Sequence, residues 1–323
     1  MIALLNKAQQ EQIIDYLTQL VNSYLETQKH IYVILEPMEH DEINHLFLKV
    51  EMRYTEPVAL FDERLEDVGP RISELGNNKK FDRWILERAL FERWTGLFIT
   101  DVDLKTFTQH ISYLCNAVMF EDKPVIFRMY PPTILNEWLM ALQKENQAYQ
   151  ALGICSDIFY IMNFPEQVAH YHFENHIVTR QELNLLNDKT QEISVPIEYE
   201  SIEILPEEKW RLTANQINSL SYARAYHLVH KFCKHFLAIP SVYEKYSVQE
   251  LHKHIIKVVN LCFKYKITET YLMQELTKLY FSYTKSWHNS EKIILSALEN
   301  NDSGKEAIVE DIANILIRNN VTS

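Results

Sequence analysis

The chain has 323 residues, of which 47% are hydrophobic and 12% aromatic, and its formal net charge at pH 7 is −12. This composition predicts a folded globular protein with one large core or two ordinary ones, and it excludes a disordered chain. The acidic balance opposes general nucleic-acid binding, and five glycines are too few for several Gly-rich phosphate loops.

Several functional classes lack their sequence signatures. Neither GxxxxGK(S/T) nor GxGxxG occurs, which argues against a P-loop or a dinucleotide-binding fold. The chain begins MIALLNKAQQEQ without a basic n-region, and no segment approaches the roughly 20 apolar residues that span a bilayer. The cysteines are scattered, with no CxxC pair: Cys115, Cys155, Cys233 and Cys262. We therefore expect a reduced, cytoplasmic protein that binds neither nucleic acid nor membrane.

The first half of the chain alternates predicted helices and strands. Apolar residues at helical spacing predict an amphipathic helix over residues 9–28. Short apolar runs predict strands over 31–35, 46–50 and 57–61, and residues 81–90 have a helical pattern.

The most informative segment runs from Trp94 to Leu142. Its pattern predicts a strand over 97–100, a helix, a second strand over 125–127, and a second helix after the turn at Pro131. Enzymes built on such units usually place glycines or a nucleophile where the strands end, and this segment has neither. The pattern therefore favours a binding protein.

These patterns predict an α/β N-terminal lobe over residues 1–165, with a mixed, partly parallel sheet and flanking helices. Residues 166–208 contain 2 basic and 10 acidic side chains and are expected to form an acidic connecting segment with one or two short strands or a hairpin. An all-α C-terminal lobe of three or four helices is predicted over residues 209–323. Thr213 and Gln216 have the spacing of a capping box at the start of its first helix.

The best candidate metal site is the segment His170–His176 (HYHFENH). On a strand, His170, His172, Glu174 and His176 point to one face, so imidazoles and a carboxylate would gather there. Four positions along one strand, however, span too great a length for all of them to reach one ion. We therefore favour a strand with a solvated polar face and with Tyr171 and Phe173 buried, and we predict no bound metal or cofactor.

Two further motifs resemble catalytic ones without matching them. His40 and His45 are five residues apart, which rotates them off a common helical face and departs from HExxH. Asp101 and Asp103 follow an apolar strand, as in haloacid dehalogenase phosphatases, but Lys105 stands where those enzymes have Thr or Val. Helix capping explains these aspartates more simply, and we predict no catalytic residues.

Arg128 directly follows an apolar strand, where an arginine needs a carboxylate or carbonyl partner. One explanation is an ion pair that holds the sheet to a neighbouring helix. The alternative is contact with a partner protein, and Arg128, Tyr130 and Trp138 are the predicted partner-binding residues.

Four blocks of the sequence resemble the N-terminal domain of the type VI secretion effector chaperones. They are GPRISEL at 69–75, WTGLF at 94–98, His110 in the following helix, and FRMYPP at 127–132. Two C-terminal blocks are also similar to that family, LTANQI at 212–217 and KYKIT at 264–268. The chain departs from the family pattern at Pro131 and Thr133, where Asp and Arg are frequent, and at Lys266, which replaces a turn glycine.

The resemblance implies a cytosolic, non-catalytic adaptor that holds one cognate secreted effector and loads it onto the VgrG spike. Two alternatives remain. One is a small metal-dependent or phosphatase-like hydrolase that uses the histidines at 170–176 or Asp101 and Asp103. The other is a structural scaffold subunit.

Overall fold

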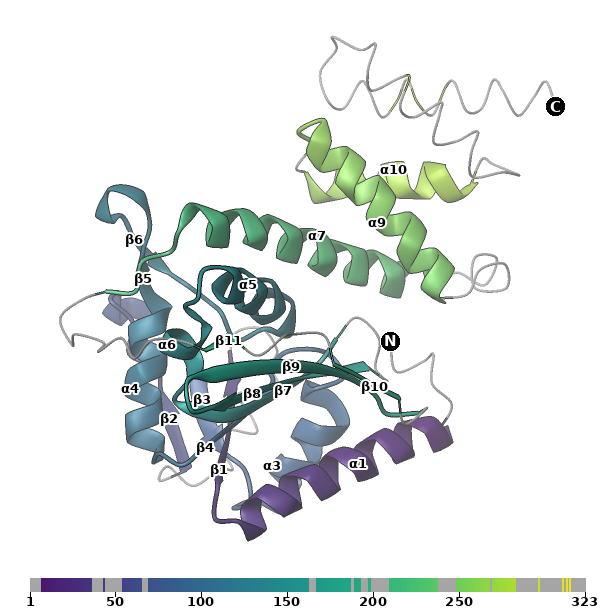
Figure 1. Ribbon diagram of the computed structural model, residues 1–323. Coiled ribbons are helices and arrows are strands. Elements are labelled where there is room, and N and C mark those ends of the chain that lie inside the picture. Colours follow the sequence, from purple (N-terminus) through teal and green to yellow (C-terminus); the bar gives the residue numbers. More distant parts are fainter. Residues whose placement is uncertain are drawn as a thin grey trace. The chain divides into compact units, whose positions relative to one another are not determined.

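The computed structural model of the protein, drawn as a ribbon in Figure 1, forms two compact units. They divide between Ala223 and Arg224. Unit 1 comprises Met1–Ala223 and unit 2 comprises Arg224–Ser323. The structure describes residues 7–36, 43, 54–65, 69–162, 167–186, 189–192, 197–198, 209–237, 248–267, 269–282, 296, 310, 312 and 314.

A large β-sheet forms the middle of unit 1. Its strands are β1 (His30–Leu35), β2 (Thr55–Pro57), β3 (Arg71–Glu74), β4 (Leu97–Thr100), β7 (Cys155–Ile161), β8 (Gln167–Glu174), β9 (Ile177–Asn184), β10 (Lys189–Glu192) and β11 (Ile197–Glu198). In the described residues these nine strands are ordered β10-β9-β8-β7-β4-β1-β3-β2, and β11 pairs with β9 off this path. All of their pairings are antiparallel.

The predicted fold class, a partly parallel α/β lobe followed by an all-α lobe, is therefore wrong. The protein has a mixed fold in which an N-terminal helix precedes a large antiparallel sheet and helices follow at the C-terminus. The predicted second strand of the Trp94–Leu142 segment does not join this sheet. It forms β6 (Pro124–Ile126), which pairs with β5 (Asn116–Val118) in a separate two-stranded ribbon.

The path between β4 and β7 explains the antiparallel pairing. The chain runs through α4 (Leu104–Cys115), the β5–β6 ribbon, α5 (Pro132–Lys144) and α6 (Ala148–Leu152) before it enters the sheet again. It returns to the end of β4 from which it departed, because Thr100 pairs with Cys155, the first residue of β7. A strand that starts beside the end of its neighbour must run in the opposite direction.

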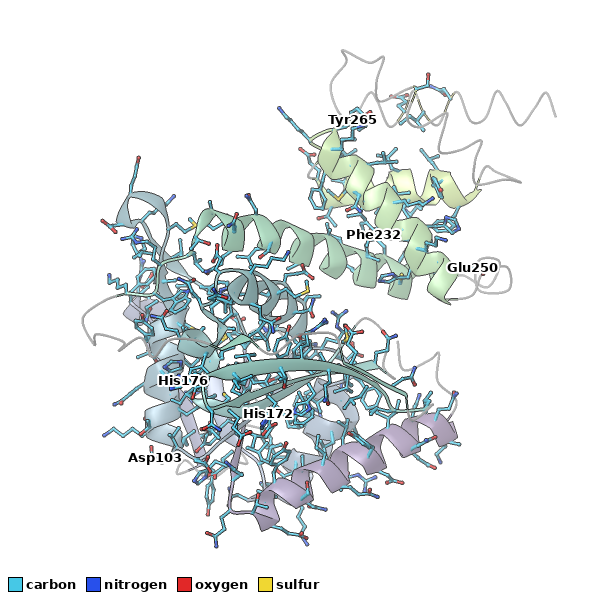
Figure 2. The ribbon with its side chains drawn as sticks, in the orientation of Figure 1. Asp103, His172, His176, Phe232, Glu250 and Tyr265 are labelled. Atoms are coloured by element: carbon cyan, nitrogen blue, oxygen red, sulfur yellow. The ribbon has the colours of Figure 1, made fainter. Side chains whose placement is uncertain are left out.

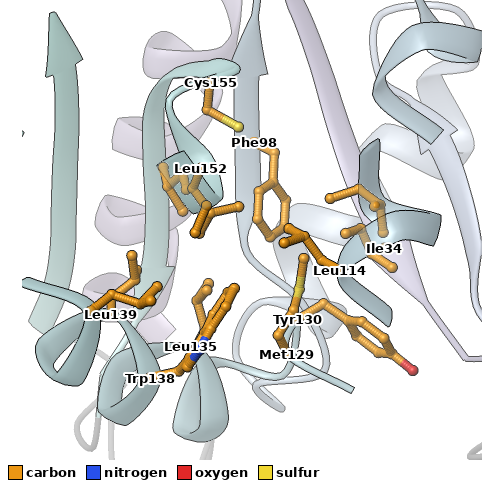
Figure 3. Packing of buried hydrophobic residues seen from close by; sticks show 14 of the residues in the cluster. Ile34, Phe98, Leu114, Met129, Tyr130, Leu135, Trp138, Leu139, Leu152 and Cys155 are labelled. Atoms are coloured by element: carbon orange, nitrogen blue, oxygen red, sulfur yellow. The ribbon is translucent and has the colours of Figure 1, made fainter. Parts of the chain in front are cut away.

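Helices cover both faces of the sheet. One face packs with α1 (Lys7–Glu26), α3 (Lys79–Trp84) and the π-helical turn Ile85–Ala89. The other face packs with α4, α5 and α6, and Figure 3 shows part of this core. Tyr32 and Ile34 of β1 join the second core, while Ile31 and Val33 join the first. The partly parallel sheet was predicted because strands and helices alternate along the chain. The same alternation occurs here, but the helical connection between β4 and β7 joins antiparallel strands.

Two short 3₁₀ turns, Glu63–Leu65 and Phe120–Asp122, complete the described elements of unit 1 apart from the start of α7. The predicted acidic connector does contain a hairpin, one of the forms expected for it, but the strands of that hairpin, β8 and β9, pair over eight residues and belong to the main sheet. Asn175 and His176 form their turn and both have left-handed backbone angles, with φ of 49° and 63°. The predicted boundaries at 165 and 208 therefore do not coincide with the division after Ala223.

The described part of unit 2 consists of helices. Helix α7 (Ala214–Leu237) begins in unit 1, and its residues from Arg224 onward belong to unit 2 together with α9 (Val248–Lys264) and α10 (Thr270–Ser282). Side chains from the three helices share one apolar cluster, to which Phe232, Ile255 and Leu276 contribute. Phe232 is labelled in Figure 2.

Candidate functional site

The block Trp94–Gly96 fixes the start of β4 against its two neighbouring strands. The buried Thr95 hydroxyl accepts a hydrogen bond from the amide of Ile34 at 3.1 Å and donates one to the carbonyl of Gly96 at 3.0 Å. A Cβ atom at Gly96 would lie 2.8 Å from the carbonyl oxygen of Phe159 in β7. Only glycine fits this close approach of two strands without a shift, so the block has a structural role.

His110 also has a structural role. Its Nε2 lies 2.7 Å from the carbonyl oxygen of Ala151 and donates to it, which ties α4 to α6. Burial lowers the pKa of His110, and the bond to Ala151 opposes this effect without reversing it. A neutral imidazole that donates from Nε2 satisfies this contact.

A charged cluster lies where the chain leaves β6 toward α5. Nη2 of Arg128 lies 2.7 Å from Oε1 of Glu36, and the Tyr130 hydroxyl donates to Oε2 of Glu36 at 3.1 Å. The Glu36 side chain is 4% exposed, whereas that of Arg128 is 54% exposed. We call these three residues the Glu36 cluster. A buried carboxylate thus holds a guanidinium group at the protein surface.

The environment of the Glu36 cluster keeps Tyr130 protonated. Burial raises the pKa of Tyr130 far above its ordinary value, and the neighbouring Glu36 carboxylate raises it further. Burial, with a contribution from Glu36, also raises the pKa of the Cys115 thiol to about 12. Tyr130 is therefore a permanent hydrogen-bond donor to Glu36, and Cys115 is not a thiolate nucleophile at neutral pH.

Of the three predicted partner-binding residues, only Arg128 brings a polar group to the surface. Tyr130 and Trp138 are 1% and 0% exposed. Figure 3 shows the Trp138 ring among apolar residues of the core and the Tyr130 hydroxyl pointing away from them. An ion pair that holds the sheet to a helix was one of the two predicted explanations for Arg128. The ion pair is present, but its partner Glu36 directly follows strand β1 and does not lie in a helix. Contact with a partner protein remains a prediction.

Trp138 connects α5 to the start of α7. Its Nε1–H donates to Oε1 of Gln216 at 3.0 Å, and Nε2 of Gln216 donates to Glu145 at 2.7 Å and to Gln147 at 2.8 Å. The predicted capping box is half correct. The Thr213 hydroxyl accepts the Gln216 amide at 3.1 Å, but the Gln216 side chain points into this buried network instead of returning to the helix start.

The aspartates that resemble a phosphatase motif have ordinary structural partners. Asp103 is the N-cap of α4 and accepts the amide of Thr106 at 2.8 Å, which confirms the predicted capping role (Figure 2). Hydrogen bonds from Thr106 lower the pKa of Asp103. Asp101 was expected to have a capping role as well, and for it this expectation is wrong: its exposed side chain pairs with Lys29 at 2.5 Å. The other motif considered, His40 with His45, lies outside the described residues.

Two of the histidines at 170–176 converge on Asp157, which was not among the predicted site residues. Nε2 of His170 and Nδ1 of His172 each lie 2.8 Å from Oδ1 of Asp157. Asp157 lies in β7 directly opposite His172 in β8. Burial alone would raise the pKa of Asp157, but the bonds from the two histidines outweigh it and hold the pKa at about 2.

The other members of the predicted set lie outside this trio. The Glu174 carboxylate lies 3.5 Å from Nε2 of His172, on the side of the ring away from Asp157. His176 lies in the β8–β9 turn against the Tyr149 ring, at a centroid distance of 4.6 Å (Figure 2). Tyr171 and Phe173 are buried as predicted. We call Asp157, His170 and His172 the histidine–aspartate cluster.

The Glu36 cluster and both structural blocks fall within a segment that matches a known family. Residues 31–149 match the family model described as domain of unknown function (DUF4123). The DUF4123 segment covers 119 of 323 residues, so it includes Glu36, Arg128 and Trp138 but not the histidine–aspartate cluster. No curated protein and no solved structure matches the chain.

None of the described helices is both long and apolar enough to cross a bilayer.

Sequence reasoning missed two acidic residues that organise the charged groups, Glu36 and Asp157. Glu36 directly follows the apolar run of β1, which gave no signal that a partner 92 residues later would reach it. Asp157 could have been found, because it is an acidic residue within the otherwise apolar strand CSDIFYI. A charge buried in such a strand needs a polar partner.

Proposed function

We propose that this protein is a non-catalytic adaptor that binds a cognate type VI secretion effector and loads it onto the VgrG spike. The main support is the DUF4123 match over residues 31–149, because the blocks that resemble the effector chaperones lie mostly within it. We place this activity in the cytoplasm, before secretion, with the effector and the spike as partners and with neither nucleic acid nor membrane.

Arg128 is the residue that we assign to partner contact. The Glu36 carboxylate is buried and orients the guanidinium group, whose side chain is 54% exposed. A guanidinium group has five N–H donors in a fixed plane, so one ion pair leaves donors for a second acidic or carbonyl group. An oriented arginine is also a frequent energetic centre of protein interfaces, because it loses less side-chain entropy on binding.

Co-expression tests this proposal. The chain, carrying an affinity tag, is produced together with candidate effector and VgrG proteins of its own organism, and the captured complex is analysed. We expect the effector to be recovered at a fixed ratio and VgrG to be recovered through it. Recovery of neither protein would contradict the adaptor proposal. The hydrolase and scaffold alternatives would then be favoured.

Variants then locate the contact. Arg128→Ala should reduce effector recovery at least about tenfold, as expected for an arginine hot spot, while the far-ultraviolet circular dichroism is unchanged. Arg83→Ala is the control for the loss of an exposed arginine from an ion pair, here with Glu87 at 2.5 Å, and the Tm of both variants is measured because only Arg128→Ala removes the partner of a buried carboxylate. Equal recovery by the two variants would refute the role of Arg128 and leave the adaptor proposal standing.

A further inference from the structure

We propose that the histidine–aspartate cluster binds one divalent transition-metal ion, of which zinc is the representative. Asp157, His170 and His172 each offer one ligand atom, and these atoms all lie within 4.8 Å of one another. They come from the paired strands β7 and β8, whose register places Asp157 opposite His172. This ligand set differs from the one that the sequence suggested, because a buried aspartate on a second strand replaces Glu174 and His176.

The two imidazole rings are held in the orientation that a metal requires. The His170 ring stacks on Phe159, with a centroid distance of 4.0 Å and an interplanar angle of 11°. His172 directs Nδ1 toward Asp157 and Nε2 toward the Glu174 carboxylate 3.5 Å away. Metal-binding histidines usually have such a carboxylate on the second nitrogen, where it fixes the ring and increases its basicity.

The distances are close to those of a coordinated ion. Zinc binds histidine nitrogen and carboxylate oxygen at about 2.0–2.1 Å, so neighbouring ligand atoms in a tetrahedral site lie about 3.3 Å apart. Both nitrogen atoms lie 2.8 Å from Oδ1 of Asp157. An opening of about 0.5 Å for each of the two nitrogen–oxygen pairs would thus admit the ion. Side-chain rotation can supply this movement, because the His172 side chain is 41% exposed.

The donor set selects the class of ion. Two imidazoles and one carboxylate suit zinc and its first-row neighbours, whereas magnesium and calcium prefer sets made only of oxygen. Three protein ligands leave at least one position for water or for a group of another molecule. The proposal does not depend on the DUF4123 match, because all three residues lie outside residues 31–149.

Zinc titration of the full chain without a histidine tag tests the proposal. Isothermal titration calorimetry should give one site per chain, magnesium should give no heat, and cobalt substitution should produce the visible absorption bands of a low-symmetry site. His172→Ala should weaken zinc binding at least about 100-fold, and loss of the outer carboxylate in Glu174→Gln should weaken it about tenfold. The Tm of the wild type, but not of His172→Ala, should rise with zinc.

His30→Ala is the matched control, since His30 also pairs with one carboxylate, that of Glu74 at 2.6 Å, but no third ligand lies beside this pair among the residues that the structure describes. It should bind zinc as the wild type does. The absence of a one-to-one site in the wild type would overturn the proposal and leave the cluster as a hydrogen-bonded trio. Wild-type affinity in His172→Ala would overturn it as well. That variant decides the question even if His170→Ala fails to fold, because His172 is the most exposed of the three ligands.

Discussion

Replacing Gln216 tests whether the buried amide network anchors the start of α7 to the rest of unit 1. Gln216 is fully buried, and its side chain makes three hydrogen bonds of 2.7–3.0 Å, to Trp138, Glu145 and Gln147. In Gln216→Ala the indole N–H of Trp138, itself 0% exposed, loses its acceptor. A buried donor left unsatisfied costs about 1–3 kcal/mol, and the lost side-chain volume adds to that cost. We therefore expect a loss of about 2–4 kcal/mol.

Urea unfolding followed by tryptophan fluorescence measures this loss. Four of the five tryptophans (Trp84, Trp94, Trp138 and Trp210) lie in unit 1, so the signal reports mainly on that unit. Gln216→Met separates the two contributions, because it nearly restores the volume but not the acceptor, and it should lose about 1–3 kcal/mol. Asn215→Ala, at an exposed position one residue earlier, is the control and should change stability by less than about 0.5 kcal/mol. Equal stability of Gln216→Ala and Asn215→Ala would refute the reasoning.

Three further predictions concern single residues of unit 1. Burial raises the pKa of Asp82 to about 6, so ionisation of Asp82 destabilises the fold as pH rises from 4 to above 6. Asp82→Asn should therefore gain about 1–2 kcal/mol more relative to the wild type at pH 8 than at pH 4.5 in urea unfolding, after allowance for solvent screening of this partly buried side chain. A stability difference that does not change with pH would contradict this reasoning. Gly96→Ala should lose about 1–3 kcal/mol because its Cβ would meet the carbonyl oxygen of Phe159 at 2.8 Å; an unchanged unfolding midpoint would contradict that close approach. Arg128→Lys keeps the charge but not the planar donor set, so its effector recovery should fall between those of the wild type and Arg128→Ala, and full recovery would indicate that charge alone is recognised.

Local features of unit 1 were predictable because they depend on neighbours within one or two turns of the chain. The amphipathic pattern predicted over 9–28 corresponds to α1, with Ile13, Leu17 and Val21 buried on one face. Asp103 predicted the start of α4, because its carboxylate caps the helix by accepting a hydrogen bond from a backbone amide only three residues later. Thr213 likewise caps α7, although the partners of Gln216 lie about 70 residues away and were not predictable.

Strand direction and the two charged clusters were decided only by the tertiary structure. An apolar run such as Leu97–Thr100 is the same whether its partner is parallel or antiparallel, and the return of the chain beside Thr100 decided between them. Glu36 meets Arg128 across 92 residues, and Asp157 meets His172 through strand register. The sequence by itself thus determined where helices begin and which faces are apolar. The pairing and packing of distant segments decided which charged groups contact each other. The partner of a buried carboxylate lies far away in the sequence, so the residues around the carboxylate do not predict it.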